Sequence, residues 1–148
     1  MFIGEICEPT EELYLAMQRL IPQLGLHKIP PNPGEIEDLL RSEGCRLLIA
    51  RDPDEQGDIV GMLCLTLYRV PTGGRSIVED FVVDSGMRKK GVGEALIRRA
   101  MDVARAAGAN GLSLTSNPQR EEANRFYISM GFQLRKTNAY FYKLEQEK

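Results

Sequence analysis

Three consecutive basic residues and two nearby glycines stand where a strand-like run gives way to a helical one, in the segment DSGMRKKGVGEAL. The first backbone N–H groups of a helix have no partner within the helix, and the helix dipole favours an anion there. Gly91 and Gly93 lack a Cβ atom, so a pyrophosphate oxygen can approach the neighbouring amides closely. The pattern predicts an anion site with amide donors at Gly91, Val92, Gly93 and Glu94 and added charge from Arg88, Lys89 and Lys90.

Three known phosphate-binding patterns compete for this turn, and their spacing separates them. The nucleotide P-loop, G-x-x-x-x-G-K-[ST], has no match in the sequence. The dinucleotide pattern G-x-G-x-x-G needs a small residue at Leu96 and an acid after the next strand, where Thr115 and Ser116 stand. Taken alone, the hexapeptide RKKGVG also fits a basic surface turn that caps a helix. The pattern [RQ]-x-x-G-x-[GA] is met in full by Arg88, Gly91 and Gly93.

Two acidic residues, Glu79 and Asp80, interrupt a run of β-branched and aromatic residues between Ser76 and Asp84. Burial among apolar neighbours disfavours a charged carboxylate and raises its pKa toward the range that suits a general base. The alternative is that the side chains simply point to the edge of the sheet. Both interpretations stay open at the level of the residues.

Four stretches have the periodicity and the terminal residues of α-helices. Thr10 can cap the first, which Pro22 ends, and the spacing of Asn32 and Glu35 is that of a capping box for the second. Glycine ends the third and the fourth, as is common at helix C-termini. The first expected helix begins after Thr10. The other three run from Pro33 to about Gly44, from Gly91 to Gly108, and from about Arg120 to Met130.

Seven further stretches have the composition of β-strands, and they alternate with the helices in the order βααβββαβαββ. That order predicts a single domain over residues 1–148 of the α/β (α+β) class, with a mixed, mostly antiparallel central sheet and helices on both faces. The expected strands cover residues 2–7, 45–51, 59–70, 76–84, 111–115, 132–135 and 139–144.

The composition excludes several classes of protein. A hydrophobic content of 43% and a charged content of 27% are typical of a soluble globular domain. The net charge of −2 argues against a protein that coats nucleic acid. No stretch is long and apolar enough for a membrane span, and the N-terminus lacks the features of a signal peptide. We therefore expect a cytoplasmic protein that binds neither membranes nor nucleic acid.

The cysteines predict no disulfide framework and no metal site. Cys7, Cys45 and Cys64 are isolated, no C-x-x-C spacing occurs, and His27 is the only histidine. Zinc sites need a cluster of such ligands, and free cysteine is among the most frequently buried residue types. We expect three buried free thiols and no metal.

A second signature lies about thirty residues beyond the glycine turn, in LSLTSNPQREEANRFYISMGF. Together with the [RQ]-x-x-G-x-[GA] turn, it resembles the GNAT superfamily of acetyl-CoA-dependent N-acyltransferases. The resemblance covers the whole order of elements and is specific from about Ile77 to Phe132. Arg120 departs from the pattern, since many members have asparagine there. The matching positions of the second signature are Ala123, Phe126, Tyr127, Gly131 and Phe132.

The resemblance implies a slot for acetyl-CoA where the strand ending at Asp84 splays from the strand ending at Thr115. In such folds the pantetheine arm hydrogen-bonds to the free strand edge. The same bonds protect an unpaired edge that could otherwise pair with another chain. No metal is implied. The implied pantetheine contacts are Phe81, Val82, Val83, Asn117, Asn124 and Tyr127, in addition to the turn residues above.

The implied reaction is direct attack of a primary amine on the thioester in a ternary complex, with no covalent enzyme intermediate. Glu79 matches the glutamate that many relatives use as general base, acting directly or through water, while Asp80 does not align with it. Tyr127 matches the tyrosine that protonates the departing thiolate. The backbone amide of Val82 or Val83 would stabilise the oxyanion.

The acceptor is left open as a small molecule or a peptide amine. His27, in the apolar loop 21–33, and the tyrosines Tyr140 and Tyr142 are candidates to border its pocket, although each also fits an incidental position. Dimers are common in the superfamily, so a homodimer is among the expected assemblies. Two alternatives remain: a non-catalytic CoA-binding sensor or interaction module, and a nucleotide-binding regulator that uses the same turn.

Overall fold

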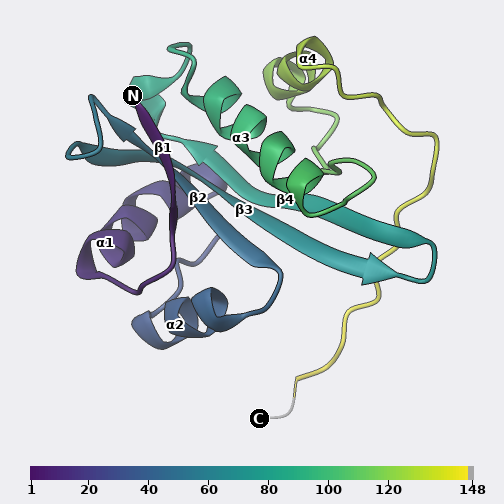
Figure 1. Cartoon of the computed structure of the whole chain (residues 1–148), viewed down its shortest axis with the longest axis horizontal. Coiled ribbons are helices and arrows are strands. Elements are labelled where there is room, and N and C mark those ends of the chain that lie inside the picture. Colours follow the sequence, from purple (N-terminus) through teal and green to yellow (C-terminus); the bar gives the residue numbers. More distant parts are fainter. Residues whose placement is uncertain (147–148) are drawn as a thin grey trace. The chain divides into compact units, whose positions relative to one another are not determined.

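The computed structural model describes residues 1–146 and divides the chain into two units, residues 1–114 and 115–148. Unit 1 contains a four-stranded antiparallel sheet in the order β1-β2-β3-β4 (Figure 1). Neighbours in the sheet are also neighbours in sequence, so the predicted antiparallel meander is confirmed. The strands are β1 (Phe2–Ile6), β2 (Cys45–Asp52), β3 (Asp58–Val70) and β4 (Gly73–Val83).

Helices cover both faces of this sheet, as the sequence predicts. In unit 1, α1 (Glu11–Leu20) and α2 (Pro33–Arg41) lie on one face, and α3 (Val92–Ala106) lies on the other (Figure 1). Two short 3-10 helices, η1 (Ile21–Leu24) and η2 (Ser85–Met87), follow α1 and β4. Unit 2 contains α4 (Glu121–Ser129).

The predicted helix caps are present. Thr10 Oγ1 accepts a hydrogen bond from the Leu13 amide at 3.1 Å. Asn32 and Glu35 bond reciprocally, each side chain to the other's backbone amide, and complete the capping box of α2. That helix ends at Arg41 rather than near Gly44, because Ser42 already has an extended backbone. These starts follow from local hydrogen bonding, which is why sequence alone locates them.

The core of unit 1 has one layer on each side of the sheet. On the face of α1 and α2, apolar side chains of both helices pack with alternate residues of the strands, including Leu47 and Met62. On the other face, α3 approaches β3 closely at Gly61, where a Cβ atom would lie 3.1 Å from Leu96 and 3.2 Å from Val92. The sheet is therefore buried on both sides, which holds β4 and α3 in fixed relation.

Three predicted strands are wrong. Residues 111–115 form no strand; the chain there makes only isolated parallel bridges to β4, at Gly74↔Ala109 and Ile77↔Ser113. Residues 132–135 and 139–144 are also outside any strand, and their segment is almost wholly exposed. The local alternation of apolar and polar residues does occur there, but alternation supplies no partner for the backbone groups. A strand needs such a partner.

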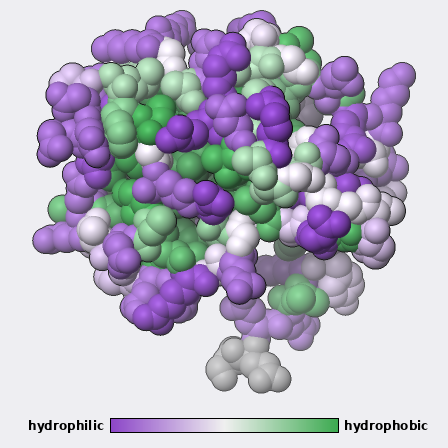
Figure 2. Space-filling model, viewed as in Figure 1, coloured by the Kyte–Doolittle hydropathy of each residue, from purple (hydrophilic) through white to green (hydrophobic). Residues whose placement is uncertain are grey.

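The surface gives two further results. Hydrophilic side chains cover most of the face in Figure 2, with apolar side chains visible in patches between them. No helix within residues 1–146 has the length and apolar character needed to cross a membrane.

All three cysteines are free, as predicted, but the prediction that they are buried is wrong: Cys7 is exposed, and Cys45 and Cys64 are partly exposed.

Candidate active site

The turn between β4 and α3 forms an open cradle at a helix N-terminus. Gly91 caps α3 with a left-handed backbone (φ 84°), and no side chain caps the helix. A Cβ atom at Gly91 would meet nothing within 4 Å, so the space beside the backbone of Gly91 is open. The first amides of α3 lack intrahelical partners by geometry, and they form the positive end of the helix dipole. The turn is therefore suited to an anion.

The charged side chains around this cradle favour the binding of an anion. Arg88, Lys89 and Lys90 are exposed, and Arg88 Nε donates to the Val83 carbonyl at 3.4 Å. Glu94 lies in the first turn of α3, where its carboxylate would repel a bound anion. Its Oε1 pairs with Arg98 at 2.8 Å, which offsets that repulsion. Val92 is buried against β3, so only its amide is available to a ligand.

Residues of α1 and η1 hold the beginning of the turn. Arg19 Nε contacts Asp84 Oδ2 at 3.3 Å, and the same guanidinium donates to the Ile59 carbonyl. Gln23 Nε2 donates to Asp84 Oδ1 at 3.3 Å, while its Oε1 accepts from the Ser85 amide at 2.9 Å. Sequence reasoning missed these contacts, because they join residues about sixty positions apart. Only a weak sign of them is present in the sequence: Arg19 and Gln23 are one helical turn apart and can therefore contact the same partner.

A β-bulge lies in β4 beside the candidate base. Cys64 of β3 pairs with Glu79 and Met62 pairs with Val82, so Asp80 and the next residue together oppose one residue of β3. Asp80 has a left-handed backbone (φ 47°), which aspartate tolerates better than most residues. Glu79 and Asp80 are consequently both exposed. Of the two interpretations that the sequence left open, burial of Glu79 among apolar neighbours is therefore the wrong one.

The bulge also changes which face of the sheet β4 serves. Before it, Val78 pairs with Leu65. By the two-residue period this places Val78 on the face of α3. After it, Val82 pairs with Met62 and belongs to the core cluster with Leu13 of α1. One extra residue thus exchanges the two faces within a single strand.

The first half of β4 is bonded along its second edge to the segment after α3. Ser113 donates to the Ser76 carbonyl at 3.0 Å, and Val78 donates to the Ser113 carbonyl at 2.8 Å. Within residues 1–114 this backbone pairing with the following segment ends at Val78. The predicted pantetheine contacts Phe81, Val82 and Val83 lie just beyond that point, where β4 approaches the cradle.

Tyr127 lies in unit 2, on α4, with its ring edge-on to two other aromatic rings. Its centroid is 5.5 Å from that of Phe126 and 5.8 Å from that of Phe132. Burial raises the pKa of the Tyr127 phenol above its ordinary value, and the positive charge of Arg120 acts in the opposite direction. The phenol is therefore protonated throughout the neutral range and can act as a proton donor.

The structure brings Asn117 and Asn124 together at the start of α4. Asn124 Nδ2 donates to the Asn117 carbonyl at 3.0 Å and to the Arg120 carbonyl at 2.8 Å. Asn117 Oδ1 accepts from the Gln119 amide at 2.9 Å. Both side chains thus stabilise the turn into α4.

The candidate acceptor-side residues are all exposed within their own units. His27 lies in an exposed turn, near the exposed side chains of Leu26 and Ile29. Tyr140 and Tyr142 are also exposed, at 88% and 85%. No strand forms around these two tyrosines, contrary to the strand expected over residues 139–144. No group of His, Cys, Asp and Glu within the described residues could hold a metal ion.

Comparison with known proteins identifies the family. The model of the Acetyltransferase (GNAT) family matches residues 11–132 of the chain. The chain belongs to this family. The match includes β2–β4, the glycine turn, α3 and α4, so it contains the cradle and the candidate catalytic positions.

Curated relatives of this GNAT chain match over part of their length. An uncharacterized N-acetyltransferase of Bacillus subtilis is 42% identical over 73 residues, covering 47% of this chain and 51% of that protein. A probable glucosamine 6-phosphate N-acetyltransferase of Oryza sativa subsp. japonica is 33% identical, covering 58% and 52%. An aminoalkylphosphonate N-acetyltransferase of Salmonella typhimurium is 34% identical, covering 51% of each. The chain spans about half the length of the curated relatives it matches.

Solved structures confirm the GNAT fold. A putative acetyltransferase from Agrobacterium tumefaciens has a TM-score of 0.83 at 19% identity, covering 97% of this chain and 100% of that one. An aminoglycoside acetyltransferase from an uncultured soil metagenomic sample, in complex with trehalose, has a TM-score of 0.83 at 17% identity, covering 98% and 96%. At this identity the similarity shows the fold alone.

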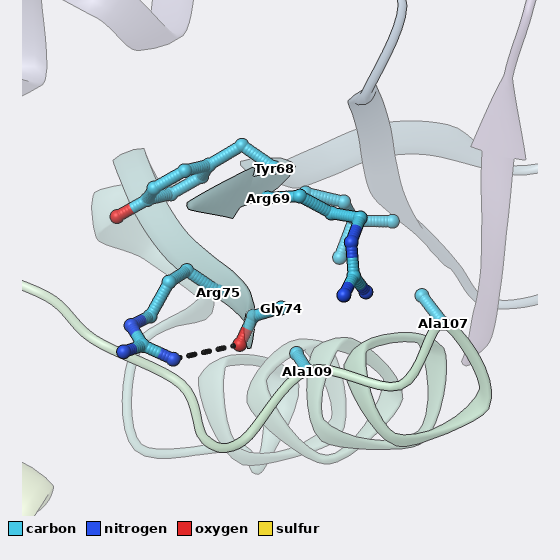
Figure 3. A pocket seen from close by; sticks show the side chains of 7 residues that line it. Tyr68, Arg69, Gly74, Arg75, Ala107 and Ala109 are labelled. Carbon is cyan, nitrogen blue, oxygen red and sulfur yellow. Dashed lines mark hydrogen bonds between the residues drawn. The ribbon is translucent and has the colours of Figure 1, made fainter. Parts of the chain in front are cut away.

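A cavity of about 150 Å³ lies at the other end of α3 in this GNAT chain. Figure 3 shows it between the tip of the β3–β4 hairpin and the C-terminal end of the helix, with Arg69 directed toward the helix. Arg75 is held by the Gly74 carbonyl at 3.2 Å and by Thr72 Oγ1 at 2.7 Å. Because α3 separates this cavity from Gly91, the cavity is distinct from the cradle.

Proposed function

We propose that the protein transfers the acetyl group of acetyl-CoA to a primary amine by direct attack in a ternary complex. The observation that carries this proposal is the uncapped N-terminus of α3 at Gly91, which follows β4 after the short helix η2 and the basic turn. Family membership supports the same chemistry. No metal takes part in the proposed reaction.

The cradle would bind the pyrophosphate of the coenzyme. Its oxygens would accept hydrogen bonds from the first amides of α3, while the basic residues before Gly91 neutralise part of the charge. The pantetheine arm would then run along Phe81–Val83 like an added strand. Asp84, fixed by Arg19 and Gln23, joins these two parts of the coenzyme site.

The proposed reaction needs a base and an acid. An amine is protonated at neutral pH, and exposed Glu79 would remove its proton through water. The amine nitrogen then attacks the thioester carbon, and the Val82 or Val83 amide stabilises the oxyanion. As the C–S bond breaks, the neutral phenol of Tyr127 gives its proton to the thiolate.

The proposed acceptor is a small primary amine in the cytoplasm. Two of the curated relatives are named for glucosamine 6-phosphate and for aminoalkylphosphonates, which are both small molecules with an amine and a phosphorus oxyanion. A panel of such amines is therefore the first screen, with peptides as the second. The exposure of Glu79 favours one alternative, a module that binds the coenzyme without transferring its acetyl group.

Calorimetry with acetyl-CoA, CoA and ATP tests the coenzyme site. We expect micromolar binding of both CoA forms and much weaker binding of ATP. Gly91→Leu should weaken acetyl-CoA binding at least about tenfold, equivalent to about 1.4 kcal/mol. Gly108→Leu is the matched control, since Gly108 (φ 79°) is equally left-handed and open but lies at the other end of α3. Equal losses in both variants would remove the cradle assignment.

Steady-state kinetics of Tyr127→Phe test the proposed acid. The variant should lower kcat about a hundredfold, the lower end of what a general acid contributes, with coenzyme binding nearly unchanged. Tyr68→Phe, on exposed β3 surface, is the control. Coenzyme binding without turnover of any amine in the wild-type protein would favour the non-catalytic module instead.

A further inference from the structure

Cys45 and Cys64, nineteen residues apart in sequence, are brought together on neighbouring strands. Cys45 of β2 pairs with Thr66 of β3, and Cys64 pairs with Leu47, so the two cysteines are diagonal neighbours on one face of the sheet. Their sulfur atoms are 3.3 Å apart. The sequence did not predict this pair, because the alignment of β2 with β3 is a long-range property.

Both thiols are within reach of a small reagent. Cys45 and Cys64 are each partly exposed, while the third cysteine, Cys7, is exposed and lies just after β1. A disulfide bond has an S–S length of about 2.05 Å, so these sulfurs need to approach by roughly 1.3 Å. Side-chain rotation with a small shift of two paired strands can supply a movement of that size.

We propose that Cys45 and Cys64 form an oxidation site, which closes to a cross-strand disulfide when the protein meets hydrogen peroxide. In the first step the sulfur of Cys45 attacks one peroxide oxygen, which gives a sulfenic acid and one water. In the second step the sulfur of Cys64 attacks that sulfenic sulfur and displaces a second water. Two thiols and one peroxide thus become one disulfide and two waters, and the peroxide is the electron acceptor.

The environment of the pair supports this order of events. Burial raises the pKa of Cys64 to about 12, with a further contribution from its hydrogen bond to Cys45 and from the nearby carboxylates Asp80 and Glu79. Cys64 therefore remains a thiol at neutral pH, while the thiolate is the reactive form. The initial attack consequently falls to Cys45.

The new bond would stand beside the bulge of β4. Cys64 pairs directly with Glu79, so oxidation would join β2 to β3 at the row of residues that carries the candidate base. The site itself does not depend on acetyl transfer. It would therefore be present in a protein that binds the coenzyme without using it.

Mass spectrometry of the native protein tests the proposal. After treatment with hydrogen peroxide and alkylation in denaturant, we expect the protein to carry one alkyl group, with an intact mass about 2 Da below that of the reduced protein plus one alkyl group. The cysteines fall in separate tryptic peptides, residues 1–19, 42–46 and 52–69. The peptides 42–46 and 52–69 should be cross-linked, and the Cys7 peptide alkylated. A link from Cys7 to either thiol, or oxidation to sulfinic acid without a link, would overturn the proposal.

Variants and unfolding provide the controls. Cys7→Ser should retain the cross-link, whereas Cys45→Ser and Cys64→Ser should lose it. Circular dichroism spectra of these two variants verify that they are folded. Dithiothreitol should restore the free thiols. Oxidation in guanidinium should give all three pairings of the cysteines. If native and unfolded protein gave the same mixture of pairings, the arrangement on β2 and β3 would not direct the reaction.

Discussion

The two halves of β4 are neighbours in sequence but differ in construction. Residues 73–78 pair with β3 on one side and with the segment after α3 on the other, through bonds such as that from the Val78 amide. Residues 79–83 contain the bulge, expose two acidic side chains and lead into the cradle. The first half is a regular strand bonded on both edges, whereas the second is interrupted by the bulge.

This difference shows how one strand can serve both the fold and a site. Regular pairing fixes the first half in the sheet, so it can hold the second half in an irregular shape. The irregular half gains what a regular strand lacks, namely consecutive exposed side chains at Glu79 and Asp80. Substitutions in the two halves should therefore have different consequences, which the following predictions use.

The largest effect is expected from Gly74→Val in the regular half. A Cβ atom at Gly74 would lie 2.8 Å from the Gly108 carbonyl oxygen, a backbone atom that cannot rotate away. We expect a loss of about 3 kcal/mol in the free energy of unfolding, as for severe overpacking. Urea unfolding measures it. Gly86→Val is the control, since its Cβ atom would meet nothing within 4 Å. Equal stability of the two variants would contradict a tightly bonded first half.

The next effect, on coenzyme binding, is expected from the hydrogen bonds that fix the beginning of the β4–α3 turn. Gln23→Ala removes the bonds to Asp84 and to the Ser85 amide, so we expect acetyl-CoA to bind about fivefold more weakly, the equivalent of one net hydrogen bond. The free energy of unfolding should change less. Calorimetry measures the binding, and Gln18→Ala on exposed α1 surface is the control. Unchanged binding in Gln23→Ala would show that the turn keeps its shape without α1.

An effect of similar size, on stability rather than binding, is expected at the bulge. Asp80→Val places a β-branched residue in a left-handed backbone, which costs about 1–2 kcal/mol in the free energy of unfolding. Asp80→Gly should cost nothing or stabilise slightly, because glycine adopts that backbone freely. Thermal unfolding of both variants measures the difference. A valine variant as stable as the glycine variant would mean that the bulge relaxes easily.

The smallest effect is expected far from β4, at the contact between α1 and β2. A hydrogen bond from Arg51 lowers the pKa of Glu12 below its usual value, against the opposing effect of burial. A lowered pKa stabilises the fold above the unfolded-state value, near 4.5, and the stabilisation disappears as the pH falls through the folded-state value. Glu12→Gln should therefore lower stability by about 0.5 kcal/mol at neutral pH.

Urea unfolding at two pH values checks this dependence. At a pH well below the pKa of Glu12, the wild-type protein and Glu12→Gln should unfold at the same urea concentration. Because the Glu12 side chain is half exposed, solvent screens most of the interaction. A difference that persists in acid would assign the effect to packing rather than charge.

Sequence predicted the parts of this molecule that depend on neighbouring residues. Thr10, the Asn32–Glu35 capping box and Gly91 each act within one helical turn, and each lies at a helix start as predicted. The antiparallel meander followed from short turns. These features need no knowledge of distant contacts.

Long-range features were the ones that sequence could not predict. The exposure of Glu79 results from the bulge, which depends on how β4 aligns with β3. The contact of Arg19 with Asp84 and the contact of Cys45 with Cys64 likewise depend on tertiary placement. In residues 132–144 the alternating pattern was present, but the strands were not, since a pattern does not specify a partner.

The single additional residue at Asp80 also sets a rule for protein engineering. Because the side chains before and after it face opposite layers of the core, a recombination joint placed inside residues 78–82 would direct apolar groups of one parent into the wrong layer. The segment from Val78 through Gly91 should therefore be transplanted as one piece. A donor strand that lacks the extra residue would place every side chain after the joint on the opposite face of the sheet.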